Sequence, residues 1–271
     1  MLDYLKDIVY HFGGLGIDIV KLTGTNGDVL VEGIDENKTV VVKGTMKGKI
    51  SELDGVFGLN QLDQLDRIIK IYDQKTDIVS VSRAKKEVNV EVRDDKGEPV
   101  LDKEGSILTE KKVEETIDQI IFFRANPKVQ NNYRVVDRRM IPNQYSLANK
   151  NMAWDLVFTP SKSAIEMFAA QTSIGIDDHF GFVTDIDPET KKNNLYVQLG
   201  PAGNEALLEF QKDVKADFKK NWVWPTDLVL KLLKLGETAK TTISLLDKGV
   251  MKVSLDTGLA EYEYVLPAKS R

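Results

Sequence analysis

Apolar residues recur every three or four positions at the start of the chain, which predicts a short amphipathic helix that ends at Gly13. Three runs of alternating apolar and polar residues follow: IDIVKLTG, DVLVEGI and TVVVKGTM. Turn-forming residues separate the runs, as in antiparallel hairpins. A second helix is predicted from about Leu59 to Tyr72, followed by a hairpin of the strands DIVSVS and EVNVEVR. The first half therefore predicts an antiparallel sheet with two helices.

The second half repeats this order. Thr159 and Pro160 predict a helix start, with Thr159 as the N-cap. Strand-like runs follow, then a helix from near Pro225 to Gly236, then three more strands. The order helix, strands, helix, strands thus occurs twice.

A fixed offset of 164 residues tests this repeat. It aligns Asp63 with Asp227 and Lys70 with Lys234, and it keeps the strand after each helix in register. The alignment indicates two copies of one domain, a fold duplication that is common in repeat architectures. The predicted organisation is a first domain at 1–130, a connector at 131–150 and a second domain at 151–271. An exposed loop or hairpin is predicted as an insertion at 95–116, where acids, lysines and glycines are concentrated.

Composition narrows the class of protein. Hydrophobic residues make up 42% and charged residues 29% of the 271 positions, which is typical of a globular protein with a substantial core. No apolar run is long enough for a membrane helix. The absence of cysteine excludes disulfides, thiolate metal sites and cysteine nucleophiles, and it fits a reducing compartment. The net charge of −5 argues against a uniformly basic surface that coats nucleic acid.

Cations on the predicted helices are the candidate functional residues. Both second helices carry two cations three residues apart, so the two share one side of a helix whose other face is apolar. Such side chains can contact phosphates without reading bases. They can equally be an ordinary solvated helix face, because Lys and Arg flank most amphipathic helices. The six candidates are Lys6, Arg67, Lys70, Lys162, Lys231 and Lys234.

The duplicated plan and three segments together resemble a known family. The segments are DGVFGLNQLDQLDRIIKIYD, IIFFRANP and the ending VMKVSLDTGLAEYEYVLPAKSR. They are similar to the DNA sliding clamps of large tailed bacteriophages and, more distantly, to eukaryotic and archaeal PCNA. The 95–116 insertion and the long connector depart from those clamps. The resemblance implies an α+β fold with two clamp domains per chain, and a homotrimeric ring with helices around a central hole and sheets outside.

The same resemblance implies the partners and sites. The six cations would face double-stranded DNA in the hole, without sequence preference. DNA polymerase and clamp loader would bind through peptides in an apolar groove. The matching residues are Met140, Ile141 and Pro142 in the connector and Val265, Leu266 and Pro267 in the last strand. A non-enzymatic processivity factor in the cytoplasm of an infected bacterial host is expected, with no catalytic residue, cofactor, metal or membrane partner.

Other functions fit parts of the pattern. A processivity factor that does not form a ring, as in herpesviruses, would grip DNA on an open basic face. A structural β-rich phage protein would use the repeat only as architecture. A carboxylate-dependent hydrolase would need a divalent ion bound at the acids from 177 to 189, but the calcium-loop glycine is missing there and the segment around Pro188 is typical of a hairpin turn.

Overall fold

The computed structural model describes most of the chain. The described residues are 1–72, 76–94, 96–102, 104–124, 129–142, 152–174, 178–200, 206–218, 222–236 and 240–270. Residues 143–150, most of the second half of the predicted connector, therefore lie outside the described part. No helix in these ranges is both long and apolar enough to cross a membrane.

Four α-helices form where the helical period predicts them. They are α1 (Leu2–Phe12), α2 (Leu62–Ile71), α3 (Lys162–Thr172) and α4 (Thr226–Leu235). Each buries one side: α2, for example, buries Leu65, Ile68 and Ile69 and leaves Arg67 and Lys70 exposed. The N-cap of α3 is Ser161, whose hydroxyl accepts a hydrogen bond from the Ala164 amide at 3.1 Å. The prediction of Thr159 as the N-cap was wrong: the cap lies two residues later. Thr and Ser can both cap a helix, so residue type alone does not choose between them.

The strands follow the helices in the same order in each half. The first half contains β1 (Ile19–Thr25), β2 (Asp28–Ile34), β3 (Val41–Met46), β4 (Gly55–Asn60), β5 (Ile78–Glu91), β6 (Thr109–Arg124), β7 (Val129–Arg134) and β8 (Val136–Asp137). The second half contains β9 (Leu156–Phe158), β10 (His179–Ile186), β11 (Asn193–Leu199), β12 (Ala206–Gln211), β13 (Trp222–Pro225), β14 (Lys240–Leu246), β15 (Val250–Asp256), β16 (Ala260–Pro267) and β17 (Lys269–Ser270). Two short 3₁₀ turns, Ser51–Leu53 and Arg138–Met140, complete the described elements.

These strands form three antiparallel sheets. The largest has nine strands in the order β8-β4-β1-β2-β3-β16-β15-β14-β9, so it runs from the first half into the second. The crossing point is the pairing of β3 with β16, in register from Val41 with Val265 to Met46 with Ala260. A five-stranded sheet, β12-β11-β10-β13-β17, belongs to the second half, and a three-stranded sheet, β5-β6-β7, to the first.

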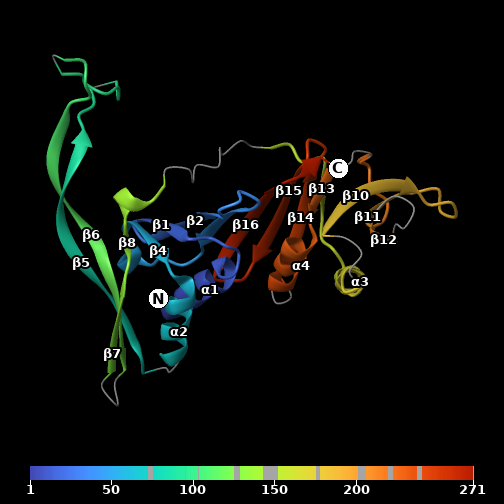
Figure 1. Ribbon diagram of the computed structural model, residues 1–271, viewed down its shortest axis with the longest axis horizontal. Coiled ribbons are helices and arrows are strands. Elements are labelled where there is room, and N and C mark those ends of the chain that lie inside the picture. The colour runs from blue at the N-terminus through green and yellow to red at the C-terminus, as the bar shows by residue number, and fades with distance from the viewer. Residues whose placement is uncertain are drawn as a thin grey trace.

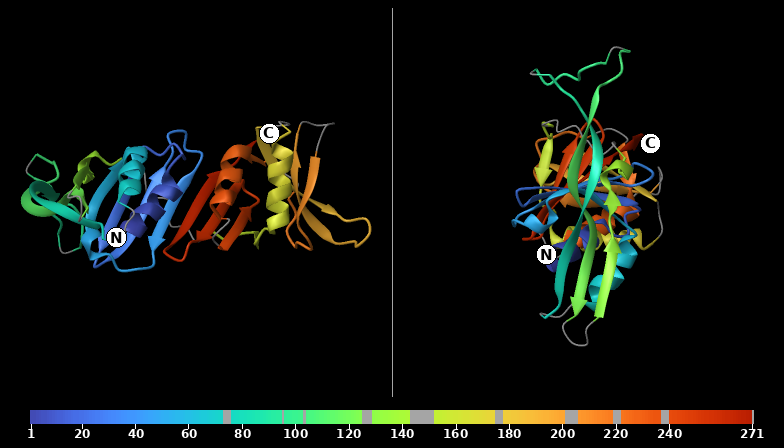
Figure 2. Two further views of the ribbon diagram at one scale, coloured as in Figure 1. Left: turned by 90° about the horizontal axis from the view of Figure 1, so that it is seen from below. Right: turned by 90° about the vertical axis from the view of Figure 1, so that its left-hand side faces the viewer.

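All four helices lie on the same side of the molecule. Figure 1 shows them toward the lower side of the molecule, and Figure 2 (left) shows all four facing the viewer when the molecule is seen from below. The fold class is therefore α+β, with helices on one face of antiparallel sheets, as predicted. The strands β7 and β12 lie at opposite ends of the molecule (Figure 1).

A buried polar cluster joins the two halves where β3 meets β16. The His11 ring of α1 stacks on Tyr262 of β16 with ring centroids 4.1 Å apart, and its Nδ1 lies 2.6 Å from the Tyr264 hydroxyl. The Tyr262 hydroxyl donates to the Asp7 carboxylate at 2.8 Å, and the Thr257 hydroxyl donates to the same oxygen at 3.3 Å. Because burial in this cluster disfavours charge, it lowers the pKa of His11 to about 4 and raises that of Asp7.

This cluster predicts a pH-dependent stability. The pKa of His11 is about 4 in the folded chain and 6.5 in the unfolded chain, so the unfolded chain binds the proton first as the pH falls. The free energy of unfolding is therefore expected to be about 2 kcal/mol lower at pH 5 than at pH 7 from this group. Asp7 acts in the opposite direction at lower pH, because its raised pKa lets the folded chain bind a proton more readily. Urea unfolding at both pH values measures the difference.

The control for this prediction is the second histidine. His11→Gln should remove most of the difference between pH 5 and pH 7, whereas His179→Gln should leave it in place. Equal pH dependence of the wild type and His11→Gln would show that the cluster is not its source.

The region from 78 to 124 differs from its prediction. Residues 77–82 and 87–93 were expected to be two strands of one hairpin, but residues 78–82 and 87–91 lie in the single strand β5, which pairs along its whole length with β6. The predicted 95–116 insertion is shorter than expected, because 109–116 belong to β6. The largely polar run from Ser82 to Glu87 breaks the alternation in β5, and the register with β6 shifts between Ser82 and Arg83, so one strand resembled two.

The β5–β6 hairpin forms an arm that projects from the body on the side away from the helices (Figure 1 and Figure 2, right). Its last ties to the body are the ion pairs of Lys86 with Asp137 at 2.9 Å and of Arg138 with Glu114 at 2.8 Å. At its tip the amides of Val92, Val100 and Leu108 each donate to a carbonyl within the same trio, at 2.8–2.9 Å. The described part of the tip is thus folded by its own backbone.

The predicted connector also begins with regular structure. Residues 131–134 belong to β7 and pair with β6, and Val136 and Asp137 form β8 and pair with β4. The sequence did not predict these strands, because VQNNYRVVD has many polar side chains and lacks regular alternation of apolar and polar residues. A strand at the edge of a sheet can form without that alternation. The domain bounds at 130 and 151 otherwise stay a prediction.

Candidate nucleic-acid interface

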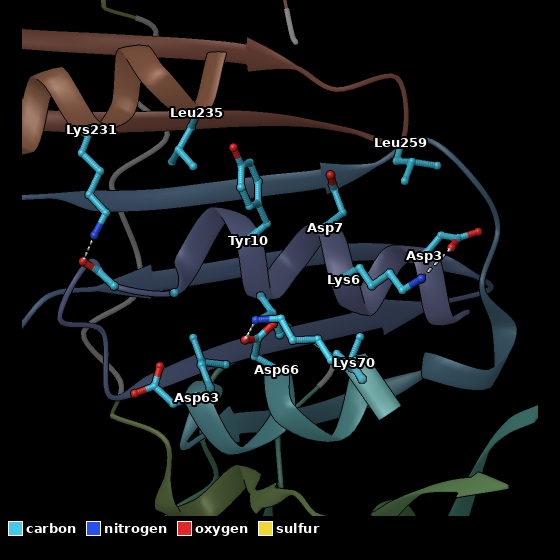
Figure 3. A pocket seen from close by; sticks show the side chains of 15 residues that line it. Asp3, Lys6, Asp7, Tyr10, Asp63, Asp66, Lys70, Lys231, Leu235 and Leu259 are labelled. Carbon is cyan, nitrogen blue, oxygen red and sulfur yellow. Dashed lines mark hydrogen bonds and ion pairs between the residues drawn. The ribbon is translucent and has the colours of Figure 1, made fainter. Parts of the chain in front are cut away.

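Three helices surround a broad cavity on the helix side of the molecule. It has a volume of about 860 Å³ and lies between α1, α2 and the end of α4. Figure 3 shows Lys6, Lys70 and Lys231 around it, together with Asp3 and Asp66. The fold therefore brings together three of the six predicted cations, from helices that are far apart in the sequence.

Each of these three lysines has a partner. Lys70 pairs with Asp66 one turn before it at 2.5 Å, and Lys6 lies 3.9 Å from Asp3. Lys231 donates to the carbonyl oxygen of Gly14, just beyond the end of α1. The first two pairs each lie within one helix and are at least partly exposed, so they contribute little to stability and can exchange for a phosphate. The third joins two helices across the junction of β3 with β16.

The other three cations lie elsewhere on the same side. Arg67 is exposed on α2, and its Nε donates to the carbonyl of Asp63 at 3.2 Å. Lys162 opens α3 and lies 3.7 Å from Glu166. Lys234 is exposed in the last turn of α4, where a cation suits the helix dipole.

The four helices are electrically balanced. They carry the six cations and six acids: Asp3, Asp7, Asp63, Asp66, Glu166 and Asp227. The net charge of −5 therefore resides in the remainder of the chain, and the helices themselves are neutral. Such a surface attracts phosphates weakly, and its affinity for them depends strongly on the salt concentration. The acids were missed in the sequence, although the Asp66–Lys70 spacing of four residues was a signal for an ion pair.

The predicted partner groove is divided by the fold. Met140 and Pro142 are exposed, but Ile141 is buried beside β4 and β8, near Gly58. Val265, Leu266 and Pro267 lie on β16, five strands away from β8 in the nine-stranded sheet. At about 4.8 Å per strand the two halves are roughly 24 Å apart. The two sets of predicted groove residues therefore lie at separate places in the described part of the chain.

Two residues of that groove are core residues. Leu266 has no exposed surface, and its carbonyl accepts a hydrogen bond from the Trp224 indole at 3.2 Å. Ile141 is likewise buried. Packing in the core accounts for the apolar character of these two residues. The assignment of the six residues to a partner groove stays a prediction.

The acids around Asp187 form a turn. Its carboxylate accepts hydrogen bonds from the amides of Glu189 and Thr190 at 2.8 Å, and the Thr190 amide lowers the pKa of Asp187. Asp177 lies outside the described residues. Within the described ranges, no three histidine or acidic side chains gather closely enough to hold a metal ion.

Comparison with solved structures identifies the fold. The chain superimposes over 100% of its length on 96% of the PCNA of A. fulgidus, solved with the C-terminal region of FEN-1, at a TM-score of 0.66 and 12% sequence identity. It superimposes over 99% of its length on 94% of the Entamoeba histolytica PCNA, at a TM-score of 0.62 and 14% identity. No protein-family model and no curated protein sequence matches the chain. At such low identity the similarity establishes the fold alone.

Proposed function

We propose that this chain, which has the fold of the PCNA sliding clamps, is itself a sliding clamp. Three copies join end to end into a ring around double-stranded DNA, and the ring tethers a DNA polymerase as its processivity factor. The observation that carries the proposal concerns β7 and β12, two edge strands at opposite ends of the molecule. By the internal repeat they correspond to β16 and β3, which pair with each other in the middle of the molecule.

The closed junction is the pairing of β3 with β16. It extends the nine-stranded sheet from one half of the chain into the other and places α1 beside α4. Lys47 adds ion pairs across it to Asp256 at 2.7 Å and Glu261 at 3.2 Å. The junction is therefore a backbone ladder with helices packed beneath it.

The repeat places β12 and β7 in the positions of β3 and β16. β12 is the third of three consecutive strands after α3, as β3 is after α1, and β7 precedes the short strand β8 as β16 precedes β17. Both β7 and β12 are edge strands in the described sheets. An edge strand offers unpaired amides and carbonyls to another chain. Because β7 and β12 lie at opposite ends of the molecule, their pairing between copies is head to tail, an arrangement that closes into a ring when its rotation divides the circle.

Side-chain burial supports the same conclusion. Leu235 at the end of α4 is 8% exposed beside the closed junction, whereas Ile71, its counterpart at the end of α2, is 50% exposed. Tyr262 of β16 is 0% exposed, whereas Val129, which occupies the same place in β7, is 40% exposed. Residues buried at the closed junction thus have exposed apolar counterparts at the open end, which indicates an interface that another copy covers.

The helix side is the DNA side in this proposal. The helices would line the hole, with Lys6, Lys70, Lys162 and Lys234 near the phosphates. A face with equal numbers of cations and acids binds DNA too weakly to hold it alone. It suits a ring, which keeps its DNA by enclosing it, and it disfavours the open-face processivity factor, which needs a net positive surface.

The proposal includes the partners that the sequence resemblance implies. A clamp loader would open the ring, and the polymerase would bind on the outside. The chain would act in the cytoplasm of the bacterial host of a tailed phage. A. fulgidus PCNA, solved with a peptide region of FEN-1, is an example of a clamp of this fold that binds a partner's C-terminal region.

Assembly is the first test. We expect sedimentation of the purified chain at micromolar concentration to give a trimer, and negative-stain images to show threefold rings with a central hole. Particles without a hole that remain monomeric at every concentration would contradict the ring. A trimer without a hole would support the structural-protein alternative.

A further inference from the structure

The helix contact at the closed junction has a counterpart at the open ends. Inside the chain, Lys231 of α4 donates to the carbonyl of Gly14, which follows the end of α1. The last carbonyls of a helix have no partner within the helix and carry partial negative charge, so a cation there is favourable. Lys231 therefore ties the second half of the chain to the end of a helix in the first half.

Arg67 occupies the position of Lys231 in the other half. The two residues are 164 positions apart, the offset that aligns α2 with α4 over their full lengths. The same repeat aligns α1 with α3, and the end of α1 with Ser173 and Ile174. If β7 pairs with β12 of the next copy, as β16 pairs with β3, α2 lies beside the next copy's α3 and Arg67 points to its end.

We propose that Arg67 binds the carbonyl oxygens at the end of α3 in the neighbouring copy, and that it closes the junction between copies instead of contacting DNA. This inference rests on the proposed ring. It reassigns one of the six predicted cations from the hole to the subunit interface, and it assigns Lys231 to the equivalent contact inside the chain.

Features at both ends fit this contact. In the single chain Arg67 is exposed, and its Nε donates to the carbonyl of Asp63 in its own helix, a bond that does not use the two terminal nitrogens of the guanidinium. Ile174, at the end of α3, is 64% exposed, although it is a large apolar residue. Gly14 has no side chain, whereas its counterpart Ile174 has a large one. A cation therefore cannot approach the carbonyls after α3 in the way that Lys231 approaches the carbonyl of Gly14. A planar guanidinium with several donors can reach neighbouring carbonyls that a single ammonium cannot.

Lys70 provides the matched control. It lies one turn after Arg67 on α2, is also an exposed cation, and pairs with Asp66 beside the cavity of Figure 3. Its counterpart in the second half is Lys234, which is exposed and stands three residues beyond the junction contact of Lys231. A change at Lys70 alters the charge of α2 as much as a change at Arg67 but leaves the proposed contact in place.

The test is the concentration at which the assembly dissociates, measured by sedimentation for the wild type, Arg67→Ala, Arg67→Lys and Lys70→Ala. Arg67→Ala should raise the dissociation concentration about tenfold, which corresponds to the loss of one charge-assisted hydrogen bond per junction. Arg67→Lys should restore part of the loss, and Lys70→Ala should change it less than twofold. Far-UV circular dichroism and thermal unfolding confirm that each variant is folded.

The outcomes separate the two proposals. An assembled wild type with Arg67→Ala dissociating at an unchanged concentration overturns the Arg67 contact and leaves the ring standing. A wild type that is monomeric at every concentration overturns the ring, and with it this contact. Equal weakening by Arg67→Ala and Lys70→Ala would show that general charge on α2, and not the position of Arg67, controls assembly, and it would also overturn the inference.

Discussion

Replacing Val129 with glutamate is expected to convert the assembled protein into folded monomers. In the proposed ring Val129 of β7 lies where Tyr262 lies at the closed junction, and Tyr262 is fully buried. A carboxylate in such a place loses its water without gaining a partner. The expected cost is about 3 kcal/mol per junction, or roughly a hundredfold in the dissociation constant, and each ring has three junctions.

The side chain at 129 is 40% exposed in the single chain, so the substitution should leave the monomer's own fold almost unchanged. Val113→Glu is the control, because Val113 is an exposed valine of the same sheet that lies on the projecting arm, away from the proposed interface. Sedimentation should show monomers for Val129→Glu and the wild-type oligomer for Val113→Glu. A normal oligomer for Val129→Glu would place the interface on another edge.

Reversing four lysines on the helices is expected to remove DNA binding and leave the ring intact. The substitutions are Lys6→Glu, Lys70→Glu, Lys162→Glu and Lys234→Glu. They lie on all four helices and change a balanced surface into a strongly negative one, with a loss of eight charge units per chain. Because the attraction is to phosphates, binding to a short duplex should fall by about a hundredfold or more at low salt. Arg67 and Lys231 are left unchanged, since both belong to junctions.

The matched control carries the same charge change on the opposite side. Lys85, Lys96, Lys111 and Lys112 are exposed on the arm, and their reversal to glutamate should leave duplex binding within a fewfold of the wild type. Fluorescence anisotropy with a labelled duplex, at a concentration where sedimentation confirms the oligomer, compares the two variants. Equal loss in both would show that overall charge, and not the helix side, determines binding.

Periodicity predicted the helices and most strands because each of these elements buries one face. Helix α2 repeats leucine and isoleucine at helical spacing, and β1 to β3 alternate strictly, so either period is visible within a single segment. Prediction failed where an element does not depend on one buried face. β7 is an edge strand with mostly polar residues, and the outer half of β5 lies on an arm where Val88 is its one buried residue.

The candidate site was predictable in its residue types but not in its arrangement. Six cations on four helices were visible in the sequence, and so was the repeat that relates α2 to α4. The separation of their roles was not, because Lys231 and Lys234 lie three residues apart on one helix, and only the position of α1 gives Lys231 its acceptor at Gly14. The same holds for Leu266 and Pro267, adjacent in sequence, of which one is buried and the other exposed.

The sequence by itself determined the α+β class, the twofold repeat of helices and strands, and the cations available to meet phosphate, since all of these follow from local periodicity and residue type. The tertiary structure decided which strands pair between the halves, which edges stay open, and which apolar residues are buried at a junction or exposed at an end. These depend on contacts between residues such as His11 and Tyr262, which are remote in the chain and meet only when β16 packs beside α1. A local sequence pattern cannot predict such a contact, because the free energy of the contact depends on both packed residues and not on either segment alone.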